Sequence, residues 1–275
     1  NTFGRQALPM TWDYAEGNPF SDSTGNFLAM VHWTTEFVDG TACSHPGTST
    51  RADAAQESVA PDLVVSTDPP YYDNIGYADL SDFFYVWLRR TLRGVYPDLL
   101  ATMTVPKMEE LVATPKRHGG KDAAERFFLD GMTKAMNQIA VQAHGAFPVS
   151  IYYAFKQAEH GEEGIASTGW ETFLSAVLRA GLSVTGTIPM RTELANRMRG
   201  TGSNALASSI VLVCRRRGED AAVTTRGRFI EELRGEMTQA VKQLQDANTP
   251  PVDMQQAAIG PGMAVYSKYR EVREA

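Results

Sequence analysis

The sequence predicts an α/β fold, in which helices pack on a sheet, and three observations support this prediction. Short apolar, β-branched runs alternate along the chain with longer segments of helical periodicity. The first clear run, residues 63–67, has the pattern of a strand buried on both faces, which is typical of parallel sheets. The chain has 275 residues, 43% of them hydrophobic, which is enough for a core and excludes wholesale disorder.

Each further element is predicted by its own pattern. A helix over residues 80–92 has its apolar residues on one face; Asp79 or Ser81 can cap its start and Gly94 can end it. Other helices are expected at residues 25–37, 122–143, 168–180 and 229–244, and strands at residues 147–155, 182–188 and 209–214. Irregular chain is expected at residues 96–120 and 247–253, the second as a linker into a short tail, and a polar loop or short helix is expected at residues 191–208. About four strands result, fewer than the roughly six or seven of a complete doubly wound sheet.

Composition excludes several classes of protein. A net charge of -6 excludes a basic histone-like or ribosomal-type protein, although a locally basic face remains open. Cys43 and Cys214 alone cannot make a disulfide framework or a zinc ribbon, and the five histidines show no ligand spacing, so no metal site is expected. No apolar run reaches the ~18–20 residues of a membrane span, so we expect a cytoplasmic protein with no membrane partner.

The residues that carry chemistry are Asp68, Pro69, Pro70 and Tyr71, which directly follow the strand predicted at residues 63–67. A simple Pro-Pro turn with a packed tyrosine is the alternative interpretation. The location favours function, because open α/β sheets bind ligands beyond the carboxyl ends of their strands. This motif is similar to the catalytic Asp-Pro-Pro-Tyr of amino-methyltransferases that use S-adenosylmethionine.

The resemblance implies a role for each residue of the motif. The exocyclic amine of adenine is a poor nucleophile because its lone pair is delocalised into the ring. The Asp68 carboxylate and the Pro69 carbonyl would accept its two N–H groups, while Pro69 and Pro70 fix the backbone and Tyr71 stacks on the flipped base. Asp68 and Asp53 would also bind the cofactor, although Asp53 fits an ordinary turn aspartate equally well.

The similarity extends beyond the motif to a family of large prokaryotic adenine-specific DNA methylases, several of which are described as carrying a zinc ribbon. It implies a Rossmann-like methyltransferase sheet with helices on both faces, adenine rather than cytosine as the target, and a restriction-modification or defence setting. The most specific stretch runs from Asp68 to Leu88. Other matching stretches are residues 7–13, 207–214 and 259–263.

The Gly-rich loop Phe-x-Gly-x-Gly, which holds the cofactor in these enzymes, is not found in the sequence. Gly260-Pro261-Gly262 is the nearest string, but no clear strand precedes it. With Asn1 in place of an initiator methionine, this predicts that the chain is the catalytic part of a longer polypeptide, without its first strands. The expected organisation is an irregular segment packing on the core (1–60), the catalytic core (61–217), and a C-terminal helix and tail (218–275).

Two basic stretches are candidates for DNA contacts. Residues 89–121 hold seven basic and three acidic side chains, and residues 191–228 hold eight arginines and three acidic side chains. Solvated loops are the alternative. The best candidates for backbone contacts are Arg191, Arg197 and Arg199; Tyr72 and Asn74 are candidates for the base pocket, and Trp87 is expected in the core. The alternative functions are a nucleic-acid-binding fragment with no activity of its own and an amino-methyltransferase acting on RNA or a small amine.

Overall fold

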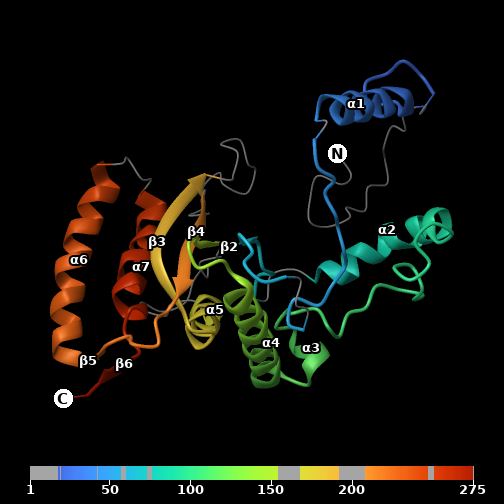
Figure 1. The fold of residues 1–275 in the computed structure, drawn as a ribbon. Helices are drawn as coiled ribbons and strands as arrows, with labels where there is room; N and C mark the ends of the chain where they lie inside the picture. Colours follow the sequence, from blue (N-terminus) through green and yellow to red (C-terminus); the bar gives the residue numbers. More distant parts are fainter. Residues whose placement is uncertain are drawn as a thin grey trace. The chain divides into compact units, whose positions relative to one another are not determined.

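The computed structural model describes residues 18, 20–41, 43–56, 60–72, 76–153, 168–191, 208–246 and 251–274. The chain divides into two units, Asn1–Ala52 and Asp53–Ala275 (Figure 1). The first unit contains helix α1 (Phe27–Gly40), which begins where the Asn26 side chain accepts the Ala29 N–H at 2.7 Å. The helix expected at residues 25–37 is therefore confirmed, whereas the packing of residues 1–60 on the core stays a prediction.

A four-stranded mixed sheet organises the second unit. Its strand order is β1-β2-β4-β3, with β1 parallel to β2 and β4 antiparallel to both of its neighbours. The strands are β1 (Ser66–Thr67), β2 (Val149–Tyr153), β3 (Leu182–Arg191) and β4 (Ser208–Arg216). The described residues also form seven helices and a parallel pair, β5 (Val223–Thr225) with β6 (Glu271–Arg273). The expected α/β class and the three later strands are confirmed.

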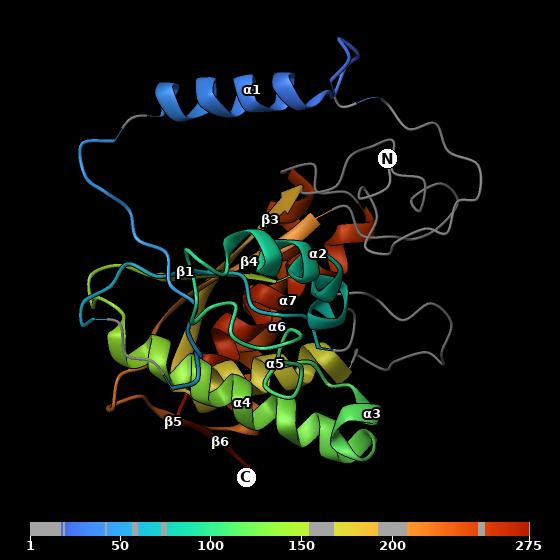
Figure 2. The ribbon, with the colours of Figure 1, turned by 90° about the vertical axis from the view of Figure 1, so that its right-hand side faces the viewer.

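The core lies between the sheet and two neighbouring helices, α4 (Lys121–Gln142) and α5 (Thr168–Arg179), which run side by side in Figures 1 and 2. Alternate residues of β2 are buried, and Ile151 lies directly opposite Leu212 of β4, so their side chains share one face. Phe128 of α4 and Phe173 of α5 are fully buried in the same cluster. These are the helices that the periodicity predicts at residues 122–143 and 168–180.

At the other end of the sheet, helix α7 (Pro251–Ser267) packs along β3, and α6 (Arg226–Asp246) packs on α7. The Ser267 hydroxyl accepts the Val184 N–H at 2.8 Å, which ties α7 to the outer edge of β3. The helix expected at residues 229–244 is confirmed by α6. The short tail expected after residue 253 is wrong, because this stretch is the long helix α7.

The strand expected over residues 63–67 is shorter and more exposed than its apolar pattern suggests. Only Ser66 and Thr67 pair with β2, while Leu63 makes an isolated bridge with Ala143. Val65 packs against the core, but the side chain of Val64 is 69% exposed. Burial on both faces is therefore wrong: β1 is an edge strand, and Val64 and Ser66, which share one face, are exposed.

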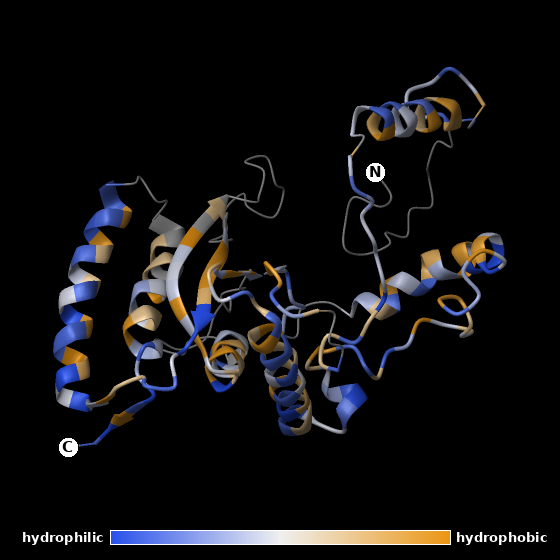
Figure 3. Cartoon of the chain, viewed as in Figure 1, coloured by the Kyte–Doolittle hydropathy of each residue, from blue (hydrophilic) through white to orange (hydrophobic). Residues whose placement is uncertain are grey.

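Helix α2 (Tyr77–Leu92) confirms the helix predicted at residues 80–92, but not the burial of its apolar face. Phe83, Phe84 and Trp87 are all exposed, so the expectation of Trp87 in the core is wrong. The buried residues of α2 are Ala78 and Tyr85, which lie on its opposite side against the following loop. Figure 3 shows the resulting hydrophobic stretches on this helix.

Gly260 and Gly262 lie inside α7, with Pro261 between them, rather than in a loop after a strand. We predict that Gly260→Ala destabilises the second unit by about 1–3 kcal/mol, because a Cβ at Gly260 would overlap the Thr187 side chain. A Cβ at Gly262 would meet Met237 Sδ at 3.6 Å, an ordinary contact, so Gly262→Ala is the matched control. Urea unfolding of both variants measures this; an equal effect at the two glycines would contradict the packing role.

Candidate functional site

The motif Asp68–Tyr71 leaves the sheet at the carboxyl end of β1. Since β1 and β2 are parallel, the carboxyl ends of both strands lie at the same edge of the sheet, and β2 ends there at Tyr153. Along the motif, Asp68 is exposed, Pro69 is buried, and Pro70 and Tyr71 are partly buried. The structure therefore anchors the motif through Pro69 and leaves the carboxylate open to a ligand.

An aromatic cluster supports the motif from the core. The Tyr71 ring meets the Tyr153 ring edge-on, with centroids 5.5 Å apart. Tyr153 is itself stacked on Phe173 at 3.9 Å and lies tilted against Trp170 at 5.4 Å. The Tyr153 hydroxyl also accepts the Tyr72 N–H at 3.3 Å. Rings and backbone together fix the direction in which the chain leaves the sheet.

Tyr72 packs inward. Its ring meets the Phe128 ring edge-on at 5.2 Å, and a Cβ placed on Gly169 of α5 would lie 2.8 Å from Tyr72 Cβ. The start of α5 therefore approaches Tyr72 more closely than any larger residue would allow. A contact of Tyr72 with a substrate base stays a prediction.

Asp68 carries the carboxylate of the motif. Partial burial raises the pKa of the Asp68 carboxyl, because desolvation penalises the charged form. Across the described parts of the chain, no hydrogen bond or ion pair engages this carboxylate. Asp68 thus keeps its acceptor capacity for a ligand.

The structure describes only some of the other predicted site residues. Asp53 is exposed in a turn, where its carboxylate accepts the Ala55 N–H at 2.9 Å and the Gln56 side-chain amide. This geometry is that of a turn aspartate, and cofactor binding by Asp53 stays a prediction. The backbone of Arg191 pairs with Ser208 at the end of β3. Outside the described residues, or described without a side chain, lie Asn74, Arg191, Arg197 and Arg199.

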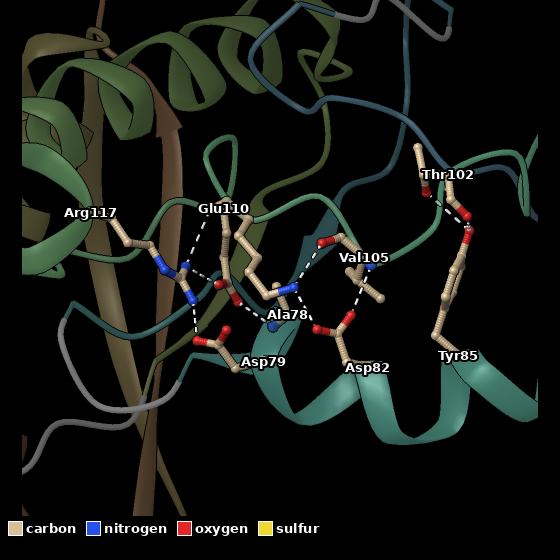
Figure 4. A network of polar contacts seen from close by, with 9 residues as sticks. Ala78, Asp79, Asp82, Tyr85, Thr102, Val105, Glu110 and Arg117 are labelled. Atoms are coloured by element: carbon tan, nitrogen blue, oxygen red, sulfur yellow. Dashed lines mark hydrogen bonds and ion pairs between the residues drawn. The ribbon is translucent and has the colours of Figure 1, made fainter.

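The sequence does not predict the polar network that surrounds the amino-terminal half of α2 (Figure 4). It joins α2 to the segment that follows, residues 96–120, which was expected only as an irregular loop. This segment includes α3 (Pro115–His118) and is anchored by its buried residues Leu100, Val112 and Ala113. Three side chains of α2 take part in it: Asp79 binds Arg117, Asp82 binds Lys107, and Tyr85 bonds to Thr102.

The network changes the interpretation of the basic stretch at residues 89–121. Lys107 binds Asp82 at 2.6 Å, and Arg117 binds both Glu110 at 2.6 Å and Asp79 at 2.5 Å. These two cations are therefore neutralised within the protein and are poor candidates for phosphate contacts. Charge counting missed this, because the acidic partners Asp79 and Asp82 lie before the stretch that was counted.

The fold and the site together define a mixed α/β protein with an Asp-Pro-Pro-Tyr motif at the carboxyl end of a parallel edge strand. No family model, curated protein or solved structure matches the chain. Within the described residues, no three His, Cys, Asp or Glu side chains gather as metal ligands would. None of the described helices has the length and apolar character needed to cross a membrane.

Proposed function

We propose that this chain is the catalytic part of an S-adenosylmethionine-dependent amino-methyltransferase acting on adenine N6 in DNA. The observation that carries the proposal is the exposed Asp68 carboxylate, at the carboxyl end of β1, within Asp-Pro-Pro-Tyr. The parallel pairing of β1 with β2 supports it, because ligands of open α/β sheets bind at such strand ends. The resemblance of residues 68–88 to the adenine-specific DNA methylases adds the reaction and the substrate.

The motif can prepare an exocyclic amine for attack on a methyl group. Asp68 would accept one amine N–H and the Pro69 carbonyl the other, which favours the pyramidal nitrogen with a free lone pair. The buried Pro69 ring keeps that carbonyl fixed. Tyr71, held edge-on by Tyr153, would support the face of a base taken out of the helix. Alignment then supplies most of the rate, without a strong base.

The residues described fit the cofactor only in part. S-adenosylmethionine would supply the sulfonium methyl group, and Asp53 and Asp68 are its candidate contacts. The Gly260–Gly262 string lies in a helix that packs on Thr187, so it does not provide the missing Gly-rich loop. We infer that a complete Rossmann-like sheet, with helices on both faces and the cofactor loop, needs further strands from a longer polypeptide.

This incomplete fit favours one alternative function, a nucleic-acid-binding fragment with no activity of its own. An RNA amino-methyltransferase is the other alternative. Transfer of a labelled methyl group to duplex DNA, single-stranded DNA and RNA, measured side by side, decides between the substrates. A rise in melting temperature with millimolar S-adenosylmethionine would exclude a chain without a cofactor site, because a ligand of the native state stabilises it.

The proposal predicts how kcat/KM for methyl transfer depends on pH on the acid side. Asp68 accepts an amine N–H only when it is ionised, and burial raises its pKa above the ordinary value of 3.8. As the pH falls through this raised pKa, the carboxylate is protonated and methyl transfer is lost. We therefore expect the acid limb of kcat/KM above pH 3.8, and we expect Asp68→Asn to remove that limb. A limb that is unchanged in Asp68→Asn would assign it to another group.

A further inference from the structure

The segment after α2 contacts the chain on both sides of the residues that follow the motif. The Ala113 N–H donates to the Tyr72 carbonyl at 2.6 Å. A few residues earlier, Glu110 Oε1 accepts the Ala78 N–H at 3.0 Å. Ala113 is buried in the core cluster, so this segment is itself firmly held. The exit of the motif and the start of α2 are thus attached to one short, anchored stretch of chain.

Glu110 takes the place of a helix cap. The first N–H groups of a helix have no partner within it, and Gly76, the N-cap of α2, has no side chain to offer one. Glu110 supplies the acceptor from 32 residues further along the chain. Its negative charge also suits the amino end of the helix dipole. The beginning of α2 therefore depends on Glu110.

Arg117 holds Glu110 in this place. Its Nη1 donates to Glu110 Oε2 at 2.6 Å and to the Lys107 carbonyl at 3.2 Å. The side chains of Arg117 and Glu110 are only 12% and 14% exposed, so water competes little for the pair. Nη2 reaches Asp79 in the first turn of α2 at 2.5 Å. A Cβ on Gly76 would lie 2.9 Å from Asp79 Oδ2 and 3.0 Å from Arg117 Nη2, so the glycine leaves room for this bridge.

We propose that Glu110 and Arg117 are positioning residues for the Asp68–Tyr71 motif. Glu110 holds the Ala78 N–H at the start of α2, and the same segment holds the Tyr72 carbonyl through the Ala113 N–H. The inference rests on the proposed function for its catalytic consequence, because neither side chain touches the motif. Since a displacement of about 1 Å can cost on the order of 100-fold in rate, the pair affects methyl transfer without binding substrate.

The chain offers a matched control on the same helix and the same segment. The Tyr85 hydroxyl bonds to the Thr102 carbonyl at 2.8 Å, two helical turns beyond Ala78. Tyr85→Phe removes this bond without changing the packing of the ring. A general loosening of the segment would affect the motif in Tyr85→Phe as well, whereas a specific positioning role would not.

The test uses the full chain and two measurements, with the variants Glu110→Ala, Arg117→Met and Tyr85→Phe. In hydrogen exchange, we expect peptides covering residues 68–80 to exchange at least about tenfold faster in the first two variants and normally in Tyr85→Phe. In methyl transfer to DNA, we expect kcat to fall by about 10-fold to 100-fold with little change in KM. The conservative variants Glu110→Gln and Arg117→Lys should show smaller changes in exchange and in kcat. They replace Glu110→Ala and Arg117→Met in the test if those variants do not fold.

Each outcome decides the proposal. Unchanged exchange at residues 68–80 in Glu110→Ala and Arg117→Met would overturn it, and so would an equal increase in Tyr85→Phe. A larger KM with unchanged kcat would show a binding role and also overturn it. If the unaltered chain transfers no methyl group, the proposed function fails, but the exchange contrast still supports or overturns the positioning of the motif.

Discussion

Replacing Asp68 with alanine is expected to reduce methyl transfer by about 10²–10³-fold, the usual effect of removing one group that stabilises charge in a transition state. The reason is that the Asp68 carboxylate is the side-chain acceptor at the carboxyl end of β1, and it is exposed to a ligand. Stability should change by no more than about 0.5 kcal/mol, because the carboxylate makes no hydrogen bond or ion pair within the described parts of the chain.

The measurement is transfer of a labelled methyl group to DNA by the longest form of the protein that contains this chain. Asp98→Ala, an exposed aspartate in the loop after α2, is a matched control that should retain full activity. Urea unfolding of both variants separates a catalytic loss from a folding loss. Retained activity in Asp68→Ala would disprove the assignment of the motif.

The second large effect concerns stability. It contrasts two aromatic residues, Phe128 and Trp87, both of which the sequence places on the buried face of a helix. Phe128→Ala is expected to lower the free energy of unfolding by about 3–5 kcal/mol, because the ring is fully buried in the core against Tyr72 and leaves a cavity when removed. Trp87→Ala is expected to change it by less than about 0.5 kcal/mol, because the Trp87 side chain is 62% exposed.

Chemical denaturation of the isolated chain measures both effects under the same conditions. Val141→Ala, at another exposed apolar residue, controls for a general effect of removing surface hydrophobic groups. A large loss in Trp87→Ala would mean that the apolar side of α2 is covered in solution. A small loss in Phe128→Ala would contradict the core described here.

The elements with the strongest periodicity were predicted correctly, and the reason is local. Helices α4 and α5 carry apolar residues at helical spacing, and β2 and β4 are short apolar runs between polar segments. Such patterns arise because each element buries one side. They do not say what lies against that side: α2 has the same periodicity, yet Phe83 and Trp87 are exposed.

The candidate site likewise has one part that the sequence predicts and one part that it does not. The motif and its place after a strand were predictable, since Asp68-Pro69-Pro70-Tyr71 is contiguous in the sequence. The support of the motif was not, because Tyr153 comes from β2 and both Ala113 and Glu110 come from the segment after α2, far from the motif in the sequence. Charge counting also places Lys107 and Arg117 in a candidate DNA-binding stretch, although Lys107 is paired with Asp82 and Arg117 with both Asp79 and Glu110.

The sequence by itself determined the α/β class, most of the helices and strands, and the motif on which the proposed chemistry rests. These are properties of neighbouring residues, set by side-chain periodicity and by the rigidity of two prolines. Only the tertiary structure decided that β1 is an edge strand, that residues 251–267 are a helix with Gly260 packed on Thr187, and that Glu110 caps α2. Each of these depends on contacts between segments far apart in the chain, which local patterns do not encode.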